Sequence, residues 1–279
     1  MIQFSACKIN LGLSILEKRK DGFHSLETVF YPVHLNDIVE ITIQNTSSVK
    51  KNINDDVKFS HSGLPIPGDS ENNLCVKAYH VLKADFPQLP KVQIHLHKNI
   101  PIGAGLGGGS GDGSTVLNIL NTLFNLKLST SQLLAYALKL GSDCPFFIYN
   151  KACHASSRGE VLTPIDLNLS KYTIVLIHPG IHISTAWAFQ QLTPCNKEKT
   201  ISKIIQQPIE SWKNELINDF ELPVFKAHPL IEEIKNYLYQ EGALYASMSG
   251  SGSSLFGIFP KGKKIKLPKY SKSLRCDII

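Results

Sequence analysis

The sequence predicts a two-domain α+β protein, and three of its features indicate this fold class. Apolar and polar residues alternate near the N-terminus, as in a β-strand, and a glycine-rich run at the centre opens directly into an amphipathic helix. Strands and helices then follow without strict alternation, which favours α+β over a parallel doubly wound sheet. The chain has 279 residues, and typical domain sizes favour two domains at that length. We place the boundary near Gly159, between an N-terminal domain 1–158 and a C-terminal domain 159–279.

The first strand is predicted from a period of two. Its apolar positions are Cys7, Ile9, Leu11, Leu13 and Ile15. Such alternation predicts a half-buried strand, with Lys8 and Asn10 side by side on its other face. The Asp21-Gly22 pair predicts a turn after this strand.

Shorter patterns predict the rest of the first 100 residues. The apolar stretches 26–35 and 37–43 predict two further strands. Residues 44–73 are rich in Asn, Ser, Asp, Gly and Pro and predict loops around a short strand. Helical spacing predicts a helix over 74–82, and alternation predicts a strand over 92–96.

The centre of the chain is rich in glycine. Residues 101–113 hold seven glycines in thirteen positions. The helix that follows at once is predicted from apolar residues at helical spacing, namely Val116, Ile119, Leu120 and Leu123. A second helix is expected over 131–140 and ends at Gly141. Asp143, just before Cys144-Pro145, is expected near the N-cap of another helix.

After the boundary, the patterns predict three strands, two helices and one loop. The strands are expected at 172–177, 244–248 and 255–259. The helices are expected at 185–191 and 230–239. A loop of small residues at 249–254 joins the last two strands.

The net charge of +6 is concentrated at the C-terminus. The basic residues there are Lys261, Lys263, Lys264, Lys266, Lys269, Lys272 and Arg275. Only Tyr270 lies among them, whereas a nucleic-acid-binding face interleaves more aromatic residues with its basic ones. We therefore expect a solvated, strand-like edge here and no nucleic-acid partner.

Cysteine spacing and hydropathy indicate the compartment. The six cysteines include no CxxC pair, which argues against a zinc site or a disulfide framework. Residues 1–6 lack the charged and apolar regions of a secretory signal. No apolar run approaches the ~18 residues that a membrane span needs. We expect a cytoplasmic protein with reduced thiols and no membrane partner.

The glycine-rich run is typical of a phosphate-binding loop. Backbone N–H groups at a helix N-terminus can approach an anion closely where glycines leave room. Gly103, Gly105 and Gly108 spell G-x-G-x-x-G, but no acidic residue lies between Asp112 and Asp143, so the dinucleotide motif is excluded. The sequence also lacks the P-loop pattern and the glycine-rich loop pattern of protein kinases. A flexible linker is the alternative, and the amphipathic helix that follows favours the phosphate loop.

Lys8 and Asp143 are the candidate reactive residues. Taken singly, a lysine on a strand is more often solvated, and an Asp before x-Pro is more often a helix cap. Together with a phosphate loop they suit phosphoryl transfer to an alcohol, which needs a carboxylate near the hydroxyl and a cation near the developing charge.

Three short segments stand out along the chain: Lys8-Ile9-Asn10, residues 101–110 and residues 248–252. Together they resemble the three motifs of the GHMP kinases, small-molecule kinases that act on galactose, homoserine, mevalonate and relatives. Asp21-Gly22-Phe23-His24 resembles the Asp-Gly-Tyr-His element of one branch of this family. That branch phosphorylates 4-diphosphocytidyl-2-C-methyl-D-erythritol in the non-mevalonate route to isoprenoids. Residues 140–147 and 218–221 fit the same branch, so the resemblance spans essentially the whole chain.

The resemblance implies a fold, a phosphoryl donor and a substrate. The fold would be that of the GHMP kinases, with an N-terminal domain like domain 2 of ribosomal protein S5 and a ferredoxin-like C-terminal domain. ATP would be the donor, with Mg²⁺ beside it, and the cytidyl-methylerythritol would be the small-molecule substrate. The protein would be a monomer or a weak homodimer. The resemblance assigns no metal ligands.

Site residues are carried over by position. Asp143 would accept the proton of the 2-hydroxyl while Lys8 polarises the reacting groups. The implied substrate residues are Asn10, Phe23, His24, Thr185 and Phe189. His24 would bind the cytosine edge, and the two phenylalanines would stack on its faces. The implied ATP residues are Pro101, Ile102, Gly103, Ala104, Gly105, Leu106, Gly107, Gly108, Gly109, Ser110 and Gly111, with Asn73 and Lys98 bordering the nucleotide.

Several alternatives stay open at this point. Phe23 could pack under its turn, His24 could be a surface residue, and Phe189 could belong to a helix core. The acceptor could be homoserine or a mevalonate-type alcohol, or the protein could be a non-catalytic nucleic-acid binder. Gly111 and Gly113 also stand where the family often has Ser and Ala, which predicts a softer loop.

Overall fold

A computed structural model describes residues 1–44, 56–193, 199–267 and 275–279. The chain divides into two compact units that interleave along the sequence. Unit 1 comprises 1–7, 35–102 and 107–150, and unit 2 comprises 8–34, 103–106 and 151–279. The two longest strands, β1 (Ile2–Lys18) and β2 (His24–Ile43), therefore contribute residues to both units. The boundary near Gly159 stays a prediction. Parts of the predicted 44–73 loops and of the basic C-terminal run lie outside the described residues.

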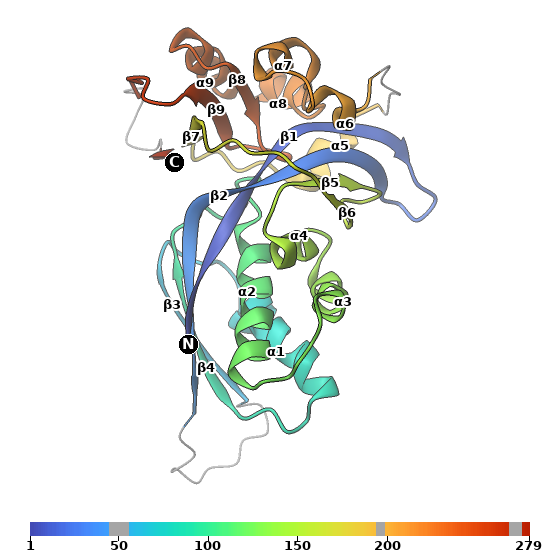
Figure 1. The fold of residues 1–279 in the computed structure, drawn as a ribbon, viewed down its shortest axis with the longest axis vertical. Coiled ribbons are helices and arrows are strands. Elements are labelled where there is room, and N and C mark those ends of the chain that lie inside the picture. Colours follow the sequence, from blue (N-terminus) through green and yellow to red (C-terminus); the bar gives the residue numbers. More distant parts are fainter. Residues whose placement is uncertain (45–55, 194–198, 268–274) are drawn as a thin grey trace. The chain divides into compact units, whose positions relative to one another are not determined.

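Unit 1 pairs two strands with the C-terminal part of β2. Its other elements are β3 (Val57–Gly63), η1 (Ser70–Asn72), α1 (Leu74–Asp85), β4 (Val92–Lys98), α2 (Gly108–Leu123), α3 (Thr130–Leu140) and α4 (Cys144–Tyr149). Strand β4 runs antiparallel to β2, with Ile41 opposite Ile94, and parallel to β3, with Phe59 opposite Ile94. Helices α1 to α4 lie together on one face of this sheet (Figure 1).

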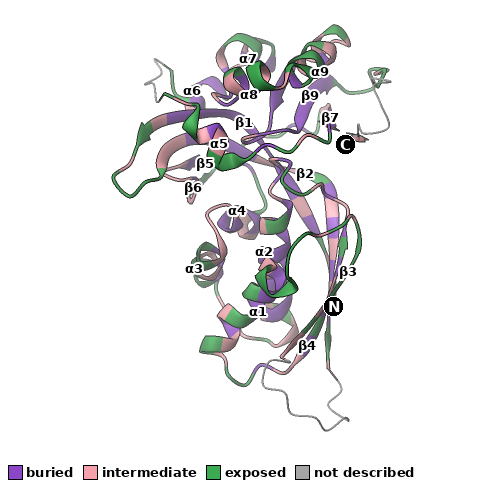
Figure 2. Ribbon diagram, turned by 180° about the vertical axis from the view of Figure 1, so that it is seen from behind, coloured by how far each residue is buried: buried purple, intermediate pink, exposed green. Residues whose placement is uncertain are grey.

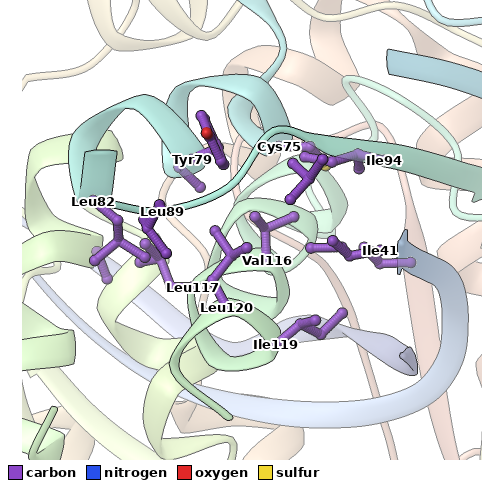
Figure 3. Packing of buried hydrophobic residues seen from close by; sticks show 14 of the residues in the cluster. Ile41, Cys75, Tyr79, Leu82, Leu89, Ile94, Val116, Leu117, Ile119 and Leu120 are labelled. Atoms are coloured by element: carbon purple, nitrogen blue, oxygen red, sulfur yellow. The ribbon is translucent and has the colours of Figure 1, made fainter. Parts of the chain in front are cut away.

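The core of unit 1 forms where α2 packs against α1 and the sheet. Val116, Leu117, Ile119 and Leu120 of α2 are fully buried, as the apolar spacing predicted. They pack in one cluster with Tyr79 of α1 and with the inward side chains of β2 and β4 (Figure 3). This packing anchors α2, so the position of its N-terminus is fixed by a rigid core.

Unit 2 contains a four-stranded sheet and most of the short helices. Its elements are β5 (Cys153–Ser156), β6 (Val161–Pro164), β7 (Tyr172–His178), α5 (Thr185–Gln190), α6 (Ile201–Ile204), α7 (Ile209–Glu215), α8 (Glu221–Ala227), α9 (Pro229–Gln240), β8 (Tyr245–Met248), β9 (Leu255–Pro260) and β10 (Arg275–Ile278). The sheet order is β10-β7-β9-β8, and all its pairs are antiparallel. The N-terminal part of β2 pairs with β5, and β5 pairs with β6.

The core of unit 2 lies between this sheet and the helices that cover it. Ile231, Ile234 and Leu238 of α9 are buried against β8 and β9, in a cluster that also holds Leu13 and Ile15 of β1. Figure 2 shows buried residues along β9 and exposed residues on the outer turns of α7 and α9. The mixture of strands and helices confirms the α+β class.

Two expectations about the strands are wrong. The stretches 26–35 and 37–43 form one continuous strand, β2, because Asn36 does not interrupt the extended backbone. The first strand is buried on both faces, since every residue from Cys7 to Ile15 is buried. Lys8 and Asn10 are 4% and 1% exposed, so neither lies on a solvated face.

Candidate active site

Lys8 and Asn10 form a buried polar chain at the middle of β1. Lys8 Nζ donates a hydrogen bond to Asn10 Oδ1 at 2.6 Å, and it lies 4.7 Å from the ring centroid of Phe30. Asn10 Nδ2 donates to Thr28 Oγ1 at 3.0 Å, and the Thr28 hydroxyl donates to the Gly12 carbonyl. Each side chain in this series of hydrogen bonds is thus oriented by the next one. A buried amine held in this way has a fixed position.

The first half of the glycine run lies against this strand. The Lys8 N–H donates to the Leu106 carbonyl at 2.9 Å. Ser249, in the loop after β8, donates its hydroxyl to the Gly105 carbonyl at 2.8 Å and accepts the Asn10 N–H at 3.3 Å. Three segments that are far apart in the sequence are therefore neighbours in unit 2. These are the same three segments that the sequence singled out.

Gly105 is required at its position by this close approach. Its φ is 77°, and a Cβ there would lie 2.1 Å from the Ser249 carbonyl oxygen, inside van der Waals contact. A residue with a side chain would also be strained in the left-handed region. Only glycine lets the two loops touch through their backbones.

Residues 218–221 hold the loop after β8 in place. Asn218 is buried, and its Nδ2 donates to the carbonyls of Met248 at 2.8 Å and Gly250 at 2.9 Å. Glu221 Oε1 accepts the Met248 N–H at 2.8 Å, while Lys235 pairs with its other oxygen at 2.6 Å. The resemblance included this segment without assigning it a role. Asn218, Phe220 and Glu221 are buried, and such burial has no local signature in the sequence.

The second half of the glycine run opens α2 in unit 1. Gly107 has φ 69° and is the N-cap, and the helix begins at Gly108. A Cβ on Gly111 would lie 2.7 Å from the Ala6 carbonyl oxygen, and one on Gly113 would lie 3.0 Å from Leu74 Cβ. These glycines let α2 pack closely on its neighbours, so their lack of side chains serves packing, and the softer loop stays a prediction.

Asp143 stands at the N-cap position of α4 in the same unit. It is half-buried, and its side chain makes no capping hydrogen bond, so a cap is not its role in the structure. The next residue, Cys144, has a thiol hydrogen-bonded to Ser110, and its carbonyl accepts the Ser114 hydroxyl at 2.8 Å. Burial raises the pKa of the Cys144 thiol to about 11, so it is protonated and unreactive. Asp143 therefore lies next to the first turns of α2.

Two predicted substrate residues are in ring contact in unit 2. The ring centroids of His24 and Phe189 lie 4.9 Å apart with an interplanar angle of 22°, which is a stacked pair. Phe220 meets the Phe189 ring edge-on at 4.9 Å. Burial, and then the charge of Lys18, lower the pKa of His24. His24 is thus neutral at pH 7 and can both donate and accept hydrogen bonds.

Phe23 and Thr185 have other neighbours. The Phe23 ring is 53% exposed, and the Arg158 guanidinium lies 4.9 Å from its centroid. Thr185 Oγ1 is 3.0 Å from Ser251 Oγ, in the loop after β8. Thr185 is therefore joined to the loop that touches Gly105, whereas Phe23 lies on the turn beside Arg158.

Asn73 and Lys98 both lie in unit 1 but have different surroundings. Asn73 Oδ1 accepts the Cys75 N–H at 2.9 Å and caps α1. A cavity of about 270 Å³ lies beside it and includes Phe59 and His61, whose rings stack at 6.3 Å. These two aromatic residues were not predicted as part of the site, because they fall in a polar stretch of the sequence that is typical of loops. Lys98 is 3% exposed and its amine forms ion pairs within the core of the unit.

Two searches of the described residues bear on metals and membranes. No group of three or more His, Cys, Asp or Glu side chains in the described part of the chain is arranged to hold a metal ion. Within the same residues, no helix combines the length and the apolar character needed to cross a bilayer.

The family models and the relatives that match this chain indicate the same family. Residues 73–151 match the GHMP kinases N terminal domain, and residues 200–267 match the GHMP kinases C terminal domain. The chain is 51% identical over 265 residues to a 4-diphosphocytidyl-2-C-methyl-D-erythritol kinase of Bacteroides fragilis, covering 95% of this chain and 94% of the relative. An enzyme of the same name from Cytophaga hutchinsonii is 48% identical over 260 residues, covering 93% and 92%.

Solved structures agree with these relatives. A crystal structure of a 4-(cytidine 5'-diphospho)-2C-methyl-D-erythritol kinase matches with a TM-score of 0.78 at 30% identity, covering 92% of this chain and 90% of that one. A homoserine kinase from Cytophaga hutchinsonii matches with a TM-score of 0.65 at 16% identity, covering 99% and 94%. At that identity the second match shows a shared fold alone.

Proposed function

Because the chain belongs to the GHMP kinases, and among them to the family of 4-diphosphocytidyl-2-C-methyl-D-erythritol kinases, we propose that it phosphorylates the 2-hydroxyl of that cytidyl-methylerythritol. ATP is its phosphoryl donor. In the reaction the substrate oxygen forms a bond to the γ-phosphorus, the bond from that phosphorus to the β,γ-bridging oxygen breaks, and ADP and a proton are released. The observation that carries the proposal is the junction of Lys8, Gly105 and Ser249 in unit 2.

Lys8 and Asp143 would provide the charges that this reaction needs. Phosphoryl transfer has a loose transition state in which charge spreads over the transferred oxygens, so positioning and electrostatic stabilisation supply most of the catalysis. The Lys8 ammonium, fixed by Asn10, suits that stabilisation. The Asp143 carboxylate, which lies beside the first turns of α2, suits acceptance of the hydroxyl proton. Lys8 lies in unit 2 and Asp143 in unit 1, and their pairing stays a prediction.

Residues 101–111 would wrap the phosphates of ATP. The positive end of α2 and the N–H groups of its first turn favour an anion, and the glycines allow close approach. Ser110 belongs to this first turn and lies beside Cys144, next to Asp143. The cavity beside Asn73, with the rings of Phe59 and His61, would suit the adenine base, because aromatic faces stack on bases.

The cytidyl group would occupy the region of His24 and Phe189. A neutral histidine matches the donor and acceptor pattern of a cytosine edge, and an aromatic ring stacks on the base. Because His24 and Phe189 are now stacked on each other, cytosine would have to separate the two rings. Asn10 and Thr185 would contact the polar part of the substrate. The Phe23 ring would contact the cytosine only if it moved away from the Arg158 guanidinium.

Magnesium is proposed as the ion that accompanies ATP. Mg²⁺ is usually bound by one or two carboxylates together with substrate phosphates, and it neutralises charge on the transferring group. Phosphate oxygens of ATP would hold most of such an ion, so no preformed cluster of protein ligands is needed, and Asp143 keeps its proposed role as proton acceptor. The cytoplasmic location and the weak or absent oligomerisation stay predictions.

An acceptor panel tests the proposed function. Purified protein would be incubated with ATP and Mg²⁺ and, in parallel, with the cytidyl-methylerythritol, homoserine or mevalonate, and ADP release would be followed. We expect turnover only with the cytidyl substrate, and inhibition by free cytidine diphosphate. Turnover with homoserine or mevalonate and none with the cytidyl substrate would reject the proposed acceptor.

A further inference from the structure

A buried group of three charged residues lies between the two ends of the glycine run. Lys98 Nζ forms ion pairs with Asp37 and with Asp112, the latter at 2.7 Å. The three side chains are 3%, 0% and 2% exposed. Because none of them reaches the surface, none can touch a bound nucleotide through its charged group. The proposed reaction uses none of these charges directly.

Each residue of this charged group is tied to one end of the phosphate-binding run. Lys98 is the last residue of β4, just before that run. Asp37 Oδ1 accepts the N–H groups of Asn99 at 2.5 Å and Ile100 at 2.8 Å, which fixes the chain where the run begins. Asp112 lies on α2 immediately after Gly111, where the run ends. The ion pairs therefore join both ends of the run through one ammonium.

The charges in this group do not balance. Two carboxylates share one lysine, and burial raises the pKa of Asp112 to about 7 against the attraction of Lys98. The ion pairs outweigh burial for the lysine and raise its pKa, so it stays charged. Asp112 Oδ1 and Ser5 Oγ are buried without a hydrogen-bond partner among the described residues. Such a group is costly unless its geometry is specific, which is the property of a positioning device.

We propose that Lys98, Asp37 and Asp112 act as a clamp that sets the separation of the two ends of the ATP loop, and that Lys98 supports ATP binding through this loop. The inference rests on the proposed use of residues 101–111 for ATP. These three are positioning residues. Losing one ion pair lets the loop ends move, and backbone N–H groups then no longer match the phosphates, which lowers the affinity for ATP.

Direct binding measurements on four variants test the clamp. Lys98→Met, Asp112→Asn and their double variant would be compared with wild type and with Lys91→Met, a matched control at the other end of the β4 segment. Lys91 forms only a half-exposed 3.7 Å ion pair with Asp56. The dissociation constants of a non-hydrolysable ATP analogue and of the cytidyl substrate would be measured separately by calorimetry. Melting temperatures would identify variants that fail to fold.

The clamp predicts a specific pattern. Each single variant should weaken ATP binding about tenfold, equivalent to about 1.4 kcal/mol, while affinity for the cytidyl substrate changes less than about twofold. Because both substitutions break the same ion pair, the double variant should lose less than the product of the two single effects. The control should bind both ligands like wild type. If Lys98→Met does not fold, Asp112→Asn still tests the clamp, because this variant keeps the Lys98–Asp37 pair. Amide hydrogen exchange at Asn99 and Ile100 should then be faster in Asp112→Asn than in wild type.

Three results would overturn the clamp. Unchanged ATP affinity in both single variants, with wild type binding both ligands, would reject the clamp and leave the proposed function standing. Fully independent effects of the two substitutions would mean that they do not act through one shared ion pair, which would reject the clamp. Failure of wild type to bind ATP would reject the clamp and the proposed function together.

Discussion

The contact between Gly105 and Ser249 gives a prediction that can be worked from the structure. In Gly105→Ala, a methyl group would lie 2.1 Å from the Ser249 carbonyl oxygen and 3.1 Å from that of Gly252. Real contacts of this kind are longer than about 3 Å, so the two loops must separate by roughly 1 Å. The hydrogen bond from the Ser249 hydroxyl to the Gly105 carbonyl would be lost or distorted.

The cost has two parts, and a matched control separates them. An alanine at φ 77° costs about 1 kcal/mol or more in backbone strain. The steric clash adds about 1–3 kcal/mol, as in other overpacked sites. Gly262 has φ 80° and open space around its Cβ position, so Gly262→Ala carries the backbone cost alone. We therefore expect Gly105→Ala to lower the free energy of unfolding by about 2–4 kcal/mol and Gly262→Ala by about 1 kcal/mol.

Urea unfolding and steady-state kinetics measure both consequences. Because the clash pushes the glycine run away from the loop after β8, Gly105→Ala should also raise the KM for ATP, whereas Gly262→Ala should leave it unchanged. Equal stability and equal KM in the two variants would refute the inferred contact between Gly105 and Ser249.

Three further predictions concern other parts of the site. Asn218→Ala should lower the free energy of unfolding, measured by urea titration, by about 2–4 kcal/mol, because the carbonyls of Met248 and Gly250 lose their donor. A loss of less than ~1 kcal/mol would contradict this. Burial raises the pKa of Asp112 from 3.8 to about 7, so the folded chain keeps this proton at pH values where the unfolded chain has lost it. The resulting stabilisation is fully present below about pH 4 and declines as the pH rises towards 7. Asp112→Asn should remove up to about 4 kcal/mol of that decline in unfolding free energy between pH 4 and 7, and an unchanged slope would count against it. Phe189→Ala should raise the KM for the cytidyl substrate about 5- to 150-fold, as for loss of one base stack of about 1–3 kcal/mol, without changing the KM for ATP. Equal rises in both KM values would place Phe189 elsewhere.

The sequence predicts best those features that depend on local pattern. The amphipathic spacing after the glycine run places α2 correctly, and Val116 and Leu120 are buried as expected. The helix expected over 131–140 is α3, and its capping box at Ser129 is a local signal that the prediction did not use. Such features need only the period of the helix and the chemistry of its ends, so no tertiary information is required to find them.

Burial of polar residues could not be predicted in the same way. Alternation in β1 indicates which residues share a face, and it does not show that a second layer covers the face of Lys8 and Asn10. The same limit applies to Lys98, whose partners Asp37 and Asp112 are 61 and 14 residues away in the sequence. Long-range ion pairs of this kind have no local signature.

Short helices and ring contacts could not be predicted from the sequence either. Helices α6, α7 and α8 span only four to seven residues, too short for an apolar period to be read. The position of Phe23 beside Arg158 depends on where two turns meet. The resemblance supplied Phe23 as a stacking residue, and only the tertiary structure reveals that its ring has another neighbour.

The central claim is that the chain transfers a phosphoryl group to the cytidyl-methylerythritol with Asp143 as the proton acceptor. The most direct measurement is single-turnover ADP formation by wild type and Asp143→Asn at saturating ATP and cytidyl substrate, with both dissociation constants measured independently. The account predicts cytidyl-dependent turnover in wild type and a loss of about 10²- to 10⁴-fold in Asp143→Asn, with both ligands still bound. Full turnover in Asp143→Asn would remove this carboxylate from the mechanism, and turnover independent of the cytidyl group would contradict the proposed substrate.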